Sequence, residues 1–208
     1  MSNKYDKVMM ASAHLWAEES YCNKRKVGAI LAKDGRILVT GYNGSVHGKP
    51  NICEETIYKC PHCGAEETEE QKLVRTQVEN SPEDFGYTFK HYCTHCNHLI
   101  NKWNVPYSSS IADMPLEDIN DLHFISTVPP TYRTNEFTVH AEQNVISYAA
   151  RGGISTEGCT LYVTTAPCKN CAKLIVQSGI KEVVYDETYK YTDGIDFLEK
   201  CNIKVRKI

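Results

Sequence analysis

The sequence predicts an α/β fold in which helices cover both faces of a mixed sheet. Apolar residues recur at helical spacing over residues 4–20, and a β-hairpin pattern follows over residues 27–42. Strand-like and helix-like segments then alternate from residue 141 to the end. A hairpin contributes antiparallel strands, whereas this alternation favours parallel ones, so the two together indicate a mixed sheet.

The individual elements follow from local patterns. Residues 4–20 form an amphipathic helix, and we expect its methionines and Trp16 in the core. Residues 27–32 and 37–42 form two strands, because the Asp-Gly pair at 34–35 can adopt the positive φ of a tight hairpin turn. The later elements are helices at 141–150, 168–178 and 195–200, and strands at 160–165, 182–185 and 204–208.

Between residues 44 and 137 this regular pattern is interrupted. Periodicity is weak there, and seven prolines interrupt any long element. A structureless loop of that length is rare inside a compact domain unless something orders it. We therefore predict a single domain over residues 1–208 with an insertion at approximately residues 45–137.

Three residues predict a catalytic zinc site, and each lies where a helix is expected to begin. They are His140, Cys168 and Cys171. Three such ligands leave one position of a zinc tetrahedron open for water, which is typical of catalytic sites. The partial positive charge at helix N-termini also favours thiolates, the form of cysteine that binds zinc.

Glu142 lies two residues after His140, where it is better placed to move protons than to act as a fourth ligand. The combination of H-x-E with P-C-x-x-C is the established signature of zinc nucleobase deaminases, in which the glutamate is the general acid and base. The alternative is a structural zinc with an incidental glutamate, although structural sites usually have four Cys or His ligands.

Two further Cys-x-x-Cys pairs, within residues 60–96 of the insertion, predict a structural zinc. Their members are Cys60, Cys63, Cys93 and Cys96. Four thiolates would close a tetrahedron and order a segment too polar to build its own core. The alternatives are free surface thiols, or a site in which a nearby histidine replaces one cysteine. The candidate histidines are His62, His91, His95 and His98.

Composition restricts the partners. The formal net charge of −3 and an acidic stretch around the first of these pairs argue against a nucleic-acid partner. No apolar run approaches the roughly 20 residues of a membrane span, and residues 1–7 lack the apolar segment of a secretory signal. We expect a cytoplasmic protein with no membrane partner. Its sequence contains 10 cysteines, and in a cytosolic protein the Cys-x-x-Cys pairs among them indicate metal sites rather than disulfides.

Several longer motifs flank the insertion. They are K-V-G-A-I at 26–30, G-Y-N-G-S at 41–45, H-A-E-Q-N at 140–144, L-Y-V-T-T-A-P-C at 161–168 and Q-S-G-I-K-E-V-V-Y at 177–185. With these motifs the sequence resembles the deoxycytidylate (dCMP) deaminases of bacteria and phages, within the cytidine deaminase superfamily. The G-Y-N-G segment that closes the second strand is the part specific to the dCMP branch.

The resemblance implies a three-layer α-β-α fold with a five-stranded sheet, assembled as a homohexamer, that converts dCMP to dUMP for thymidylate synthesis with Zn²⁺. It also implies activation by dCTP and inhibition by dTTP, with Mg²⁺ accompanying the triphosphate. The implied effector residues are Gly41, Tyr42, Asn43, Gly44, Ser45 and Gly48. The chain departs from the family in the Cys-rich insertion and in the residues at 46–47, which follow G-Y-N-G.

The resemblance also implies substrate contacts. Asn43 would bind the deoxyribose 3′-hydroxyl, because its amide can donate and accept; a turn asparagine is the alternative. Backbone groups of Ala141 and Pro167 would read the pyrimidine edge, and Tyr189 would cover the nucleotide. The candidates for the 5′-phosphate are Ser20 and the basic run at 24–26, of which Lys24 is the first choice; a solvated basic turn is the alternative.

Cys22 and Cys53 match cysteines that hold a further zinc in some phage members of the family. They are therefore candidates for a third zinc site, and buried small hydrophobic residues are the alternative.

Other functions remain open. A tRNA adenosine deaminase shares the zinc signature, but it should have a basic groove and lack G-Y-N-G. A pyrimidine deaminase of riboflavin synthesis should be followed by a reductase domain. A non-catalytic nucleotide-sensing protein on a deaminase scaffold is the third alternative, and the intact Glu142 argues against it.

Overall fold

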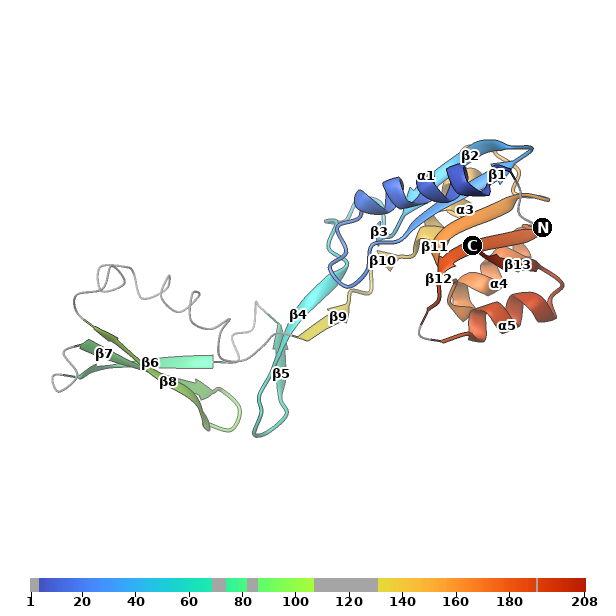
Figure 1. Cartoon of the computed structure of the whole chain (residues 1–208). Coiled ribbons are helices and arrows are strands. Elements are labelled where there is room, and N and C mark those ends of the chain that lie inside the picture. Colours follow the sequence, from blue (N-terminus) through green and yellow to red (C-terminus); the bar gives the residue numbers. More distant parts are fainter. Residues whose placement is uncertain (1–3, 69–73, 82–85, 107–130, 190) are drawn as a thin grey trace. The chain divides into compact units, whose positions relative to one another are not determined.

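The segments on either side of the predicted insertion build one mixed sheet (Figure 1). In this computed structural model the strand order is β13-β12-β11-β1-β2. β1 (Gly28–Lys33) pairs antiparallel with β2 (Arg36–Tyr42) and with β11 (Thr160–Thr165). β12 (Glu182–Glu187) pairs parallel with β11 and with β13 (Lys204–Lys207). The prediction of a mixed five-stranded sheet is confirmed.

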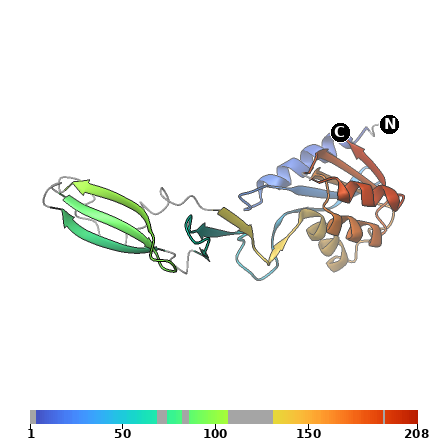
Figure 2. The same cartoon turned by 90° about the horizontal axis from the view of Figure 1, so that it is seen from below.

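Helices cover both faces of this sheet, as Figures 1 and 2 show. α1 (Asp6–Glu18) packs on one face. α3 (Ala141–Arg151), α4 (Lys169–Gln177) and α5 (Asp193–Lys200) pack on the other. The three-layer arrangement follows from the predicted order of elements, since each helix lies next to the strand that precedes or follows it.

Alternation along β1 supplies an apolar core on each face. Ala29 and Leu31 join the core beneath α3, α4 and α5, whereas Ile30 packs with Met9 and Met10 of α1. Successive side chains of a strand point to opposite faces, so one apolar run serves both cores. This arrangement explains why β1 reads as an almost continuous apolar segment.

The turn between β1 and β2 has the predicted chemistry. Asp34 has φ 52° and Gly35 has φ 74°, and Lys33 pairs with Arg36 across the turn. Both central residues therefore adopt the left-handed conformation that a two-residue hairpin of this type requires.

Small residues let α1 approach β1 closely. A Cβ atom on Gly28 would lie 1.9 Å from the carbonyl oxygen of Ala13. Met9 and Met10 are buried as predicted, but Trp16 is 39% exposed, and its ring centroid lies 6.3 Å from that of Tyr42 at an interplanar angle of 14°. The prediction of Trp16 as a core residue is wrong, because the helix packs through its small side chains and methionines.

The structure describes residues 4–68, 74–81, 86–106, 131–189 and 191–208, and the chain divides into two units. One unit comprises Met1–Glu54 and Thr134–Ile208, and the other comprises Glu55–Arg133. The second unit is shorter than the predicted insertion, because β3 (Gly44–Ser45) and β10 (Thr138–Val139) pair within the first unit.

The second unit contains more regular structure than its sequence predicts. One sheet has the order β5-β4-β9, formed by Glu66–Thr68, Glu54–Lys59 and Thr131–Thr134. Another has the order β6-β7-β8. Its strands are Val74–Ser81, Gly86–Cys93 and Leu99–Pro106. The expectation that prolines exclude long elements is wrong here, because β6 and β7 lie between prolines and β8 reaches a proline, Pro106, only at its last residue.

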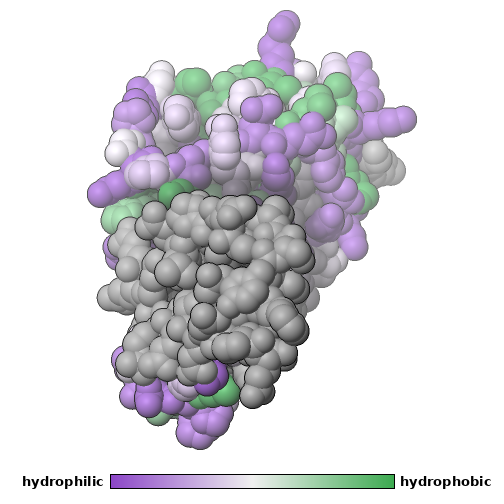
Figure 3. All heavy atoms as spheres, turned by 90° about the vertical axis from the view of Figure 1, so that its left-hand side faces the viewer, coloured by the Kyte–Doolittle hydropathy of each residue, from purple (hydrophilic) through white to green (hydrophobic). Residues whose placement is uncertain are grey.

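Hydrophilic side chains predominate among the coloured atoms of Figure 3, and apolar ones form separate patches between them. Within the described ranges, no helix is both long and apolar enough to cross a membrane.

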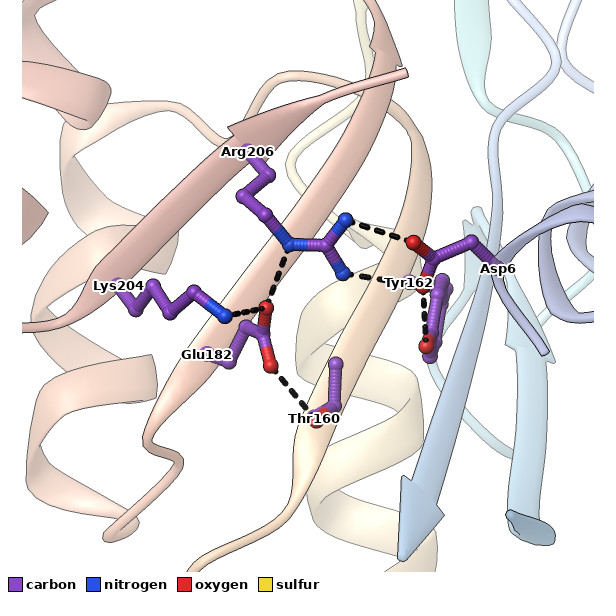
Figure 4. Close-up of polar contacts among 6 residues, drawn as sticks. All are labelled: Asp6, Thr160, Tyr162, Glu182, Lys204 and Arg206. Carbon is purple, nitrogen blue, oxygen red and sulfur yellow. Dashed lines mark hydrogen bonds and ion pairs between the residues drawn. The ribbon is translucent and has the colours of Figure 1, made fainter. Parts of the chain in front are cut away.

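A buried polar network ties α1 to the strands (Figure 4). Arg206 donates hydrogen bonds to both carboxylate oxygens of Asp6, at 2.6 and 3.0 Å, and through Nε to Glu182 at 2.6 Å. Tyr162 donates to Asp6 at 2.9 Å, and Lys204 pairs with Glu182 at 2.9 Å. Asp6 is only 3% exposed, so its charge depends on these donors for compensation.

The pKa of Glu182 is lowered in this network. Burial alone would raise its pKa, but hydrogen bonds from Lys204 and Arg206 outweigh burial. A depressed carboxyl pKa stabilises the fold at pH values above the unfolded pKa, and this contribution is lost as the pH falls through the folded value.

We therefore expect Glu182→Gln to lower the free energy of unfolding at pH 7 by about 1 to 3 kcal/mol, because hydrogen bonds to charged groups contribute about that much. The difference from wild type should shrink below about pH 4.3, the usual glutamate pKa, as the carboxyl becomes protonated in both states. Urea unfolding over a pH series measures the difference, and Glu199→Gln on the exposed side of α5 is the control. A difference that grows on acidification would contradict the prediction.

Candidate active site and zinc sites

The three predicted ligands of a catalytic zinc converge at the N-termini of two helices. His140 is the N-cap residue of α3, Cys168 is that of α4, and Cys171 lies in the first turn of α4. Nδ1 of His140 lies 3.7 Å from Sγ of Cys168 and 3.4 Å from Sγ of Cys171. In a tetrahedral site with Zn–S of about 2.3 Å and Zn–N of about 2.1 Å, neighbouring donor atoms lie about 3.6 Å apart. The residues present therefore fit zinc.

The two thiols of this group have pKa values shifted in opposite directions. The Cys171 thiol and then His140 lower the pKa of Cys168 to about 3 through hydrogen bonds. Hydrogen bonding to Cys168 and burial raise the pKa of Cys171. The hydrogen bond with Cys168 also raises the pKa of His140, although burial opposes it. A bound divalent cation would require both thiols to be deprotonated, because zinc binds the thiolate form.

Glu142 lies beside the three ligands without being one of them. It is 4% exposed and lines the same pocket as His140 and Cys168. Burial raises its pKa. Burial thus increases the proton affinity of this carboxyl group, which suits a residue that takes up and returns a proton.

A pocket of about 170 Å³ opens next to these residues. Its wall contains four of the predicted substrate residues, namely Lys24, Asn43, Ala141 and Tyr189. It also contains Arg25, from the predicted basic run, and residues that the sequence did not single out, among them Glu54, Thr138, Thr165 and Ala166. Three of these positions had a signal in the sequence. Thr165 and Ala166 belong to the motif that contains Pro167, and Arg25 belongs to the basic run at 24–26.

Two predicted contacts lie outside this wall. Ser20 is 2% exposed; its hydroxyl donates to the Asn43 carbonyl oxygen at 2.9 Å and accepts from the Cys22 N–H at 3.2 Å. The Pro167 carbonyl faces Gly194 of α5, where a Cβ atom would lie 2.0 Å from its oxygen. Ser20 shapes the loop that follows it, and Ala166 takes the place in the pocket wall that was predicted for Pro167.

The side chain of Asn43 fastens the basic loop. Its Oδ1 accepts from the Val27 N–H at 2.7 Å, and its Nδ2 donates to the Arg25 carbonyl oxygen at 2.8 Å. An asparagine amide has two donor hydrogens and two acceptor lone pairs, so one of each remains. Asn43 therefore holds the loop and still presents a donor and an acceptor to the pocket.

Cys22 and Cys53 form a disulfide rather than part of a metal-ligand group. Both cysteines are buried, which agrees with the alternative prediction that they are buried small hydrophobic residues rather than ligands of a third zinc. The structure thus contradicts the candidate third zinc site at this pair, because a sulfur atom in a disulfide is not a thiolate ligand. The pairing depends on tertiary proximity, which the sequence did not reveal.

The four cysteines of the second unit form a separate cluster. Sγ of Cys60 lies 3.9 Å from Sγ of Cys96, and Sγ of Cys63 lies 3.8 Å from Sγ of Cys93. Zinc bound by four sulfurs at about 2.3 Å requires S–S separations of about 3.8 Å. The donor atoms therefore fit a structural zinc.

Burial would raise the pKa of Cys60, but hydrogen bonds from the backbone N–H groups of Cys63 and His62 help to lower it to about 7. The four donor atoms lie within 4.8 Å of one another, and among the described residues no histidine joins this group. His62 and His98 stack on each other instead, with ring centroids 4.1 Å apart. The structure therefore favours four thiolates over a site with a histidine ligand.

A second cavity, of about 810 Å³, surrounds the end of β2. Five of the six predicted effector residues line it, namely Gly41, Tyr42, Gly44, Ser45 and Gly48. The sixth, Asn43, lines the smaller pocket beside Glu142 instead. The G-Y-N-G segment thus contributes to both cavities, with Asn43 alone of its four residues lining the smaller one.

The fold, the two helix N-termini with their three ligands, and the buried glutamate define a hydrolytic deaminase of the cytidine deaminase superfamily. The chain belongs to the MafB19-like deaminase family, whose model matches residues 3–208.

Named relatives lie in the same superfamily. The chain is 37% identical over 195 residues to the deoxycytidylate deaminase of Enterobacteria phage T4, over 93% of this chain and 84% of the relative. It is also 37% identical over 195 residues to that of Enterobacteria phage T2, over 93% and 86%. The crystal structure of the dCMP deaminase from the cyanophage S-TIM5 in complex with dCMP and dUMP superposes with a TM-score of 0.60. The identity is 26%, and the match covers 100% of this chain and 99% of that one.

We expect the double substitution Cys60→Ser with Cys93→Ser to remove about one zinc per chain, because two ligands of one tetrahedron are lost. It should also lower the melting temperature, because structural zinc contributes directly to folding. Metal analysis by mass spectrometry of the purified protein measures the first effect, and Cys201→Ser, outside both clusters, is the control. Unchanged zinc content in the double variant would show that the cluster binds no zinc.

Proposed function

We propose that this deaminase converts dCMP to dUMP and ammonia, which supplies dUMP for thymidylate synthesis. The observation that carries the proposal is the buried Glu142 beside His140, Cys168 and Cys171 in a pocket that Lys24 and Arg25 also line. The deoxycytidylate deaminases among its relatives, and the cyanophage structure with dCMP and dUMP, support the choice of substrate.

Glu142 carries the protons of the reaction. His140, Cys168 and Cys171 would hold Zn²⁺, which would act as a Lewis acid and lower the pKa of water toward neutrality. Glu142 accepts the proton of the attacking water and delivers it to N3 of cytosine, which makes C4 electrophilic. It then assists protonation of the amine that leaves C4 as ammonia, so the ring gains a carbonyl oxygen and becomes uracil.

The remaining wall of the pocket recognises the nucleotide. The free donor and acceptor of Asn43 suit the 3′-hydroxyl of the deoxyribose, which both donates and accepts. Lys24 and Arg25 suit the 5′-phosphate, since both are cationic donors. Tyr189 lies over this end of the pocket, with its ring centroid 5.8 Å from the Arg25 guanidinium carbon.

We further propose that the second cavity binds dCTP and dTTP, with Mg²⁺ accompanying the triphosphate. Its wall combines the aromatic rings of Trp16, Tyr42 and Tyr148 with the cationic side chains of Lys49 and Arg151. Aromatic rings suit a base, and cations suit a triphosphate. The G-Y-N-G segment that implied effector binding forms part of the same wall.

The two cavities share structural elements, which provides a physical route for regulation. Along α3, Glu142 faces the smaller pocket and Asn144 faces the larger cavity. Nδ2 of Asn144 donates to the Tyr42 carbonyl oxygen at 2.6 Å, and so joins α3 to the end of β2. A ligand that moves Tyr42 would therefore act on the helix that carries Glu142. Assembly as a homohexamer and a cytoplasmic location stay predictions.

We expect Glu142→Gln to lower the turnover of dCMP by at least about 10²- to 10⁴-fold, because an amide of the same shape cannot carry the proton. Zinc content should stay at the wild-type value, since Glu142 is not a ligand. Ammonia release measures turnover, and Glu136→Gln, an exposed glutamate, is the control. Wild-type protein that deaminates a tRNA anticodon stem but not dCMP would contradict the proposed substrate.

We expect Arg151→Ala to raise the dTTP concentration for half-inhibition about tenfold or more, because hydrogen bonds to charged groups contribute about 1.5 to 3 kcal/mol. The assay is dCMP deamination over a dTTP titration, with and without dCTP and Mg²⁺. Lys173→Ala, on an exposed position of α4, is the control. An unchanged dTTP concentration for half-inhibition would show that the second cavity does not take part in regulation by dTTP.

A further inference from the structure

A buried carboxylate that has no part in the proposed chemistry lies in the wall of the substrate pocket. Glu54, the first residue of β4, is 9% exposed. Its Oε2 accepts a hydrogen bond from the backbone N–H of Asn23 at 2.9 Å, and its Oε1 accepts one from the N–H of Lys24 at 3.2 Å. One carboxylate therefore fixes two consecutive peptide groups.

These peptide groups belong to the loop that carries the pocket cations. Lys24 and Arg25 both line the pocket. The next residues of the loop are held by the Asn43 amide, which contacts the Arg25 carbonyl oxygen and the Val27 N–H. Glu54 thus holds the first half of the loop and Asn43 holds the second half, so the two cations project from a backbone fastened on both sides.

The disulfide adds a covalent attachment at the same place. Cys53 is bonded to Cys22, and the following residue, Glu54, binds the peptide groups that follow Cys22. Residues 53 and 54 are therefore attached to residues 22–24 by one disulfide and two hydrogen bonds.

The charge of Glu54 makes direct contact with the substrate unfavourable. A carboxylate repels a phosphate, and a buried charge is costly unless hydrogen bonds compensate it. The two backbone donors occupy both oxygens of Glu54. Its place in the pocket wall is consistent with a role in shaping the loop rather than in touching the nucleotide.

We infer that Glu54 is a positioning residue for phosphate recognition: it holds the 22–25 loop so that Lys24 and Arg25 meet the 5′-phosphate, and it thereby sets the preference for a nucleotide over a nucleoside. The inference rests on the proposed function, because it assigns the phosphate end of the dCMP pocket.

The test compares dCMP with deoxycytidine in wild type and in Glu54→Gln. The glutamine has the same shape, but its NH₂ group opposes one of the two backbone N–H donors. KM for dCMP should rise about tenfold or more, since misplaced cations forfeit charge-assisted hydrogen bonds of about 1.5 to 3 kcal/mol. The kcat for dCMP and the kcat/KM for deoxycytidine should change little, because Glu142 and the zinc ligands stay in place.

The neighbouring Glu55→Gln is the matched control, because Glu55 pairs with Arg133 at 3.0 Å rather than with the loop. It should leave both substrates unaffected. Equal losses for dCMP and deoxycytidine in Glu54→Gln would overturn the inference, since a general structural defect does not distinguish a phosphate. Wild-type protein that is inactive on dCMP would instead refute the proposed function.

A double-mutant cycle with Lys24→Gln supplies a second readout. If Glu54 acts through the cations, Lys24→Gln should raise KM for dCMP less in the Glu54→Gln background than in wild type. Additive effects in this cycle, and in the same cycle with Arg25→Gln, would overturn the inference. If Glu54→Gln does not fold, Glu54→Asp replaces it, and the same selective rise in KM, of smaller size, is expected because the shorter side chain still accepts.

Discussion

The convergence of two helix N-termini on one point is the constraint on which this structure depends. α3 begins at His140 and α4 begins at Cys168, so the partial positive charges of both helices meet where two thiolates and an imidazole must gather. Two different sheets make this possible, because the cap of α4 follows β11 of the five-stranded sheet and the cap of α3 follows β10, which pairs with β3. Without the partial positive charges of the helix N-termini, the negative charges of the Cys168 and Cys171 thiolates would repel each other without compensation.

The rest of the first unit holds the N-termini of α3 and α4 in place and shapes the pocket beside them. The core beneath α3, α4 and α5 fixes the directions of the helices, while the core under α1 closes the opposite face. The loop at 20–27 then brings cations to the pocket that the helices define. Its shape depends on Ser20, Asn43 and Glu54, none of which is cationic. Hydrogen bonds between side chains and backbone, rather than apolar packing, therefore set the substrate end of the site.

The sequence was sufficient for the parts of the molecule that local patterns determine. The hairpin turn at 34–35, the helices that begin at the zinc ligands and the mixed sheet followed from periodicity and from Gly, His and Cys positions. Long-range contacts were harder. The disulfide between Cys22 and Cys53 and the exposure of Trp16 depend on which surfaces meet in space, and spacing along the chain does not encode that. The role of Glu54 in the loop was likewise invisible, because the partners of Glu54 are backbone groups with no sequence signature.

The hydrogen bond from Asn144 to the Tyr42 carbonyl has an evolutionary consequence. α3 presents residues to both cavities, and β2, which lines the larger one, is followed directly by Asn43 of the smaller one, so a substitution in either element can affect both environments. Adaptation of one cavity to a new molecule would therefore be pleiotropic, and lineages that change the larger cavity should need compensating changes around Glu142.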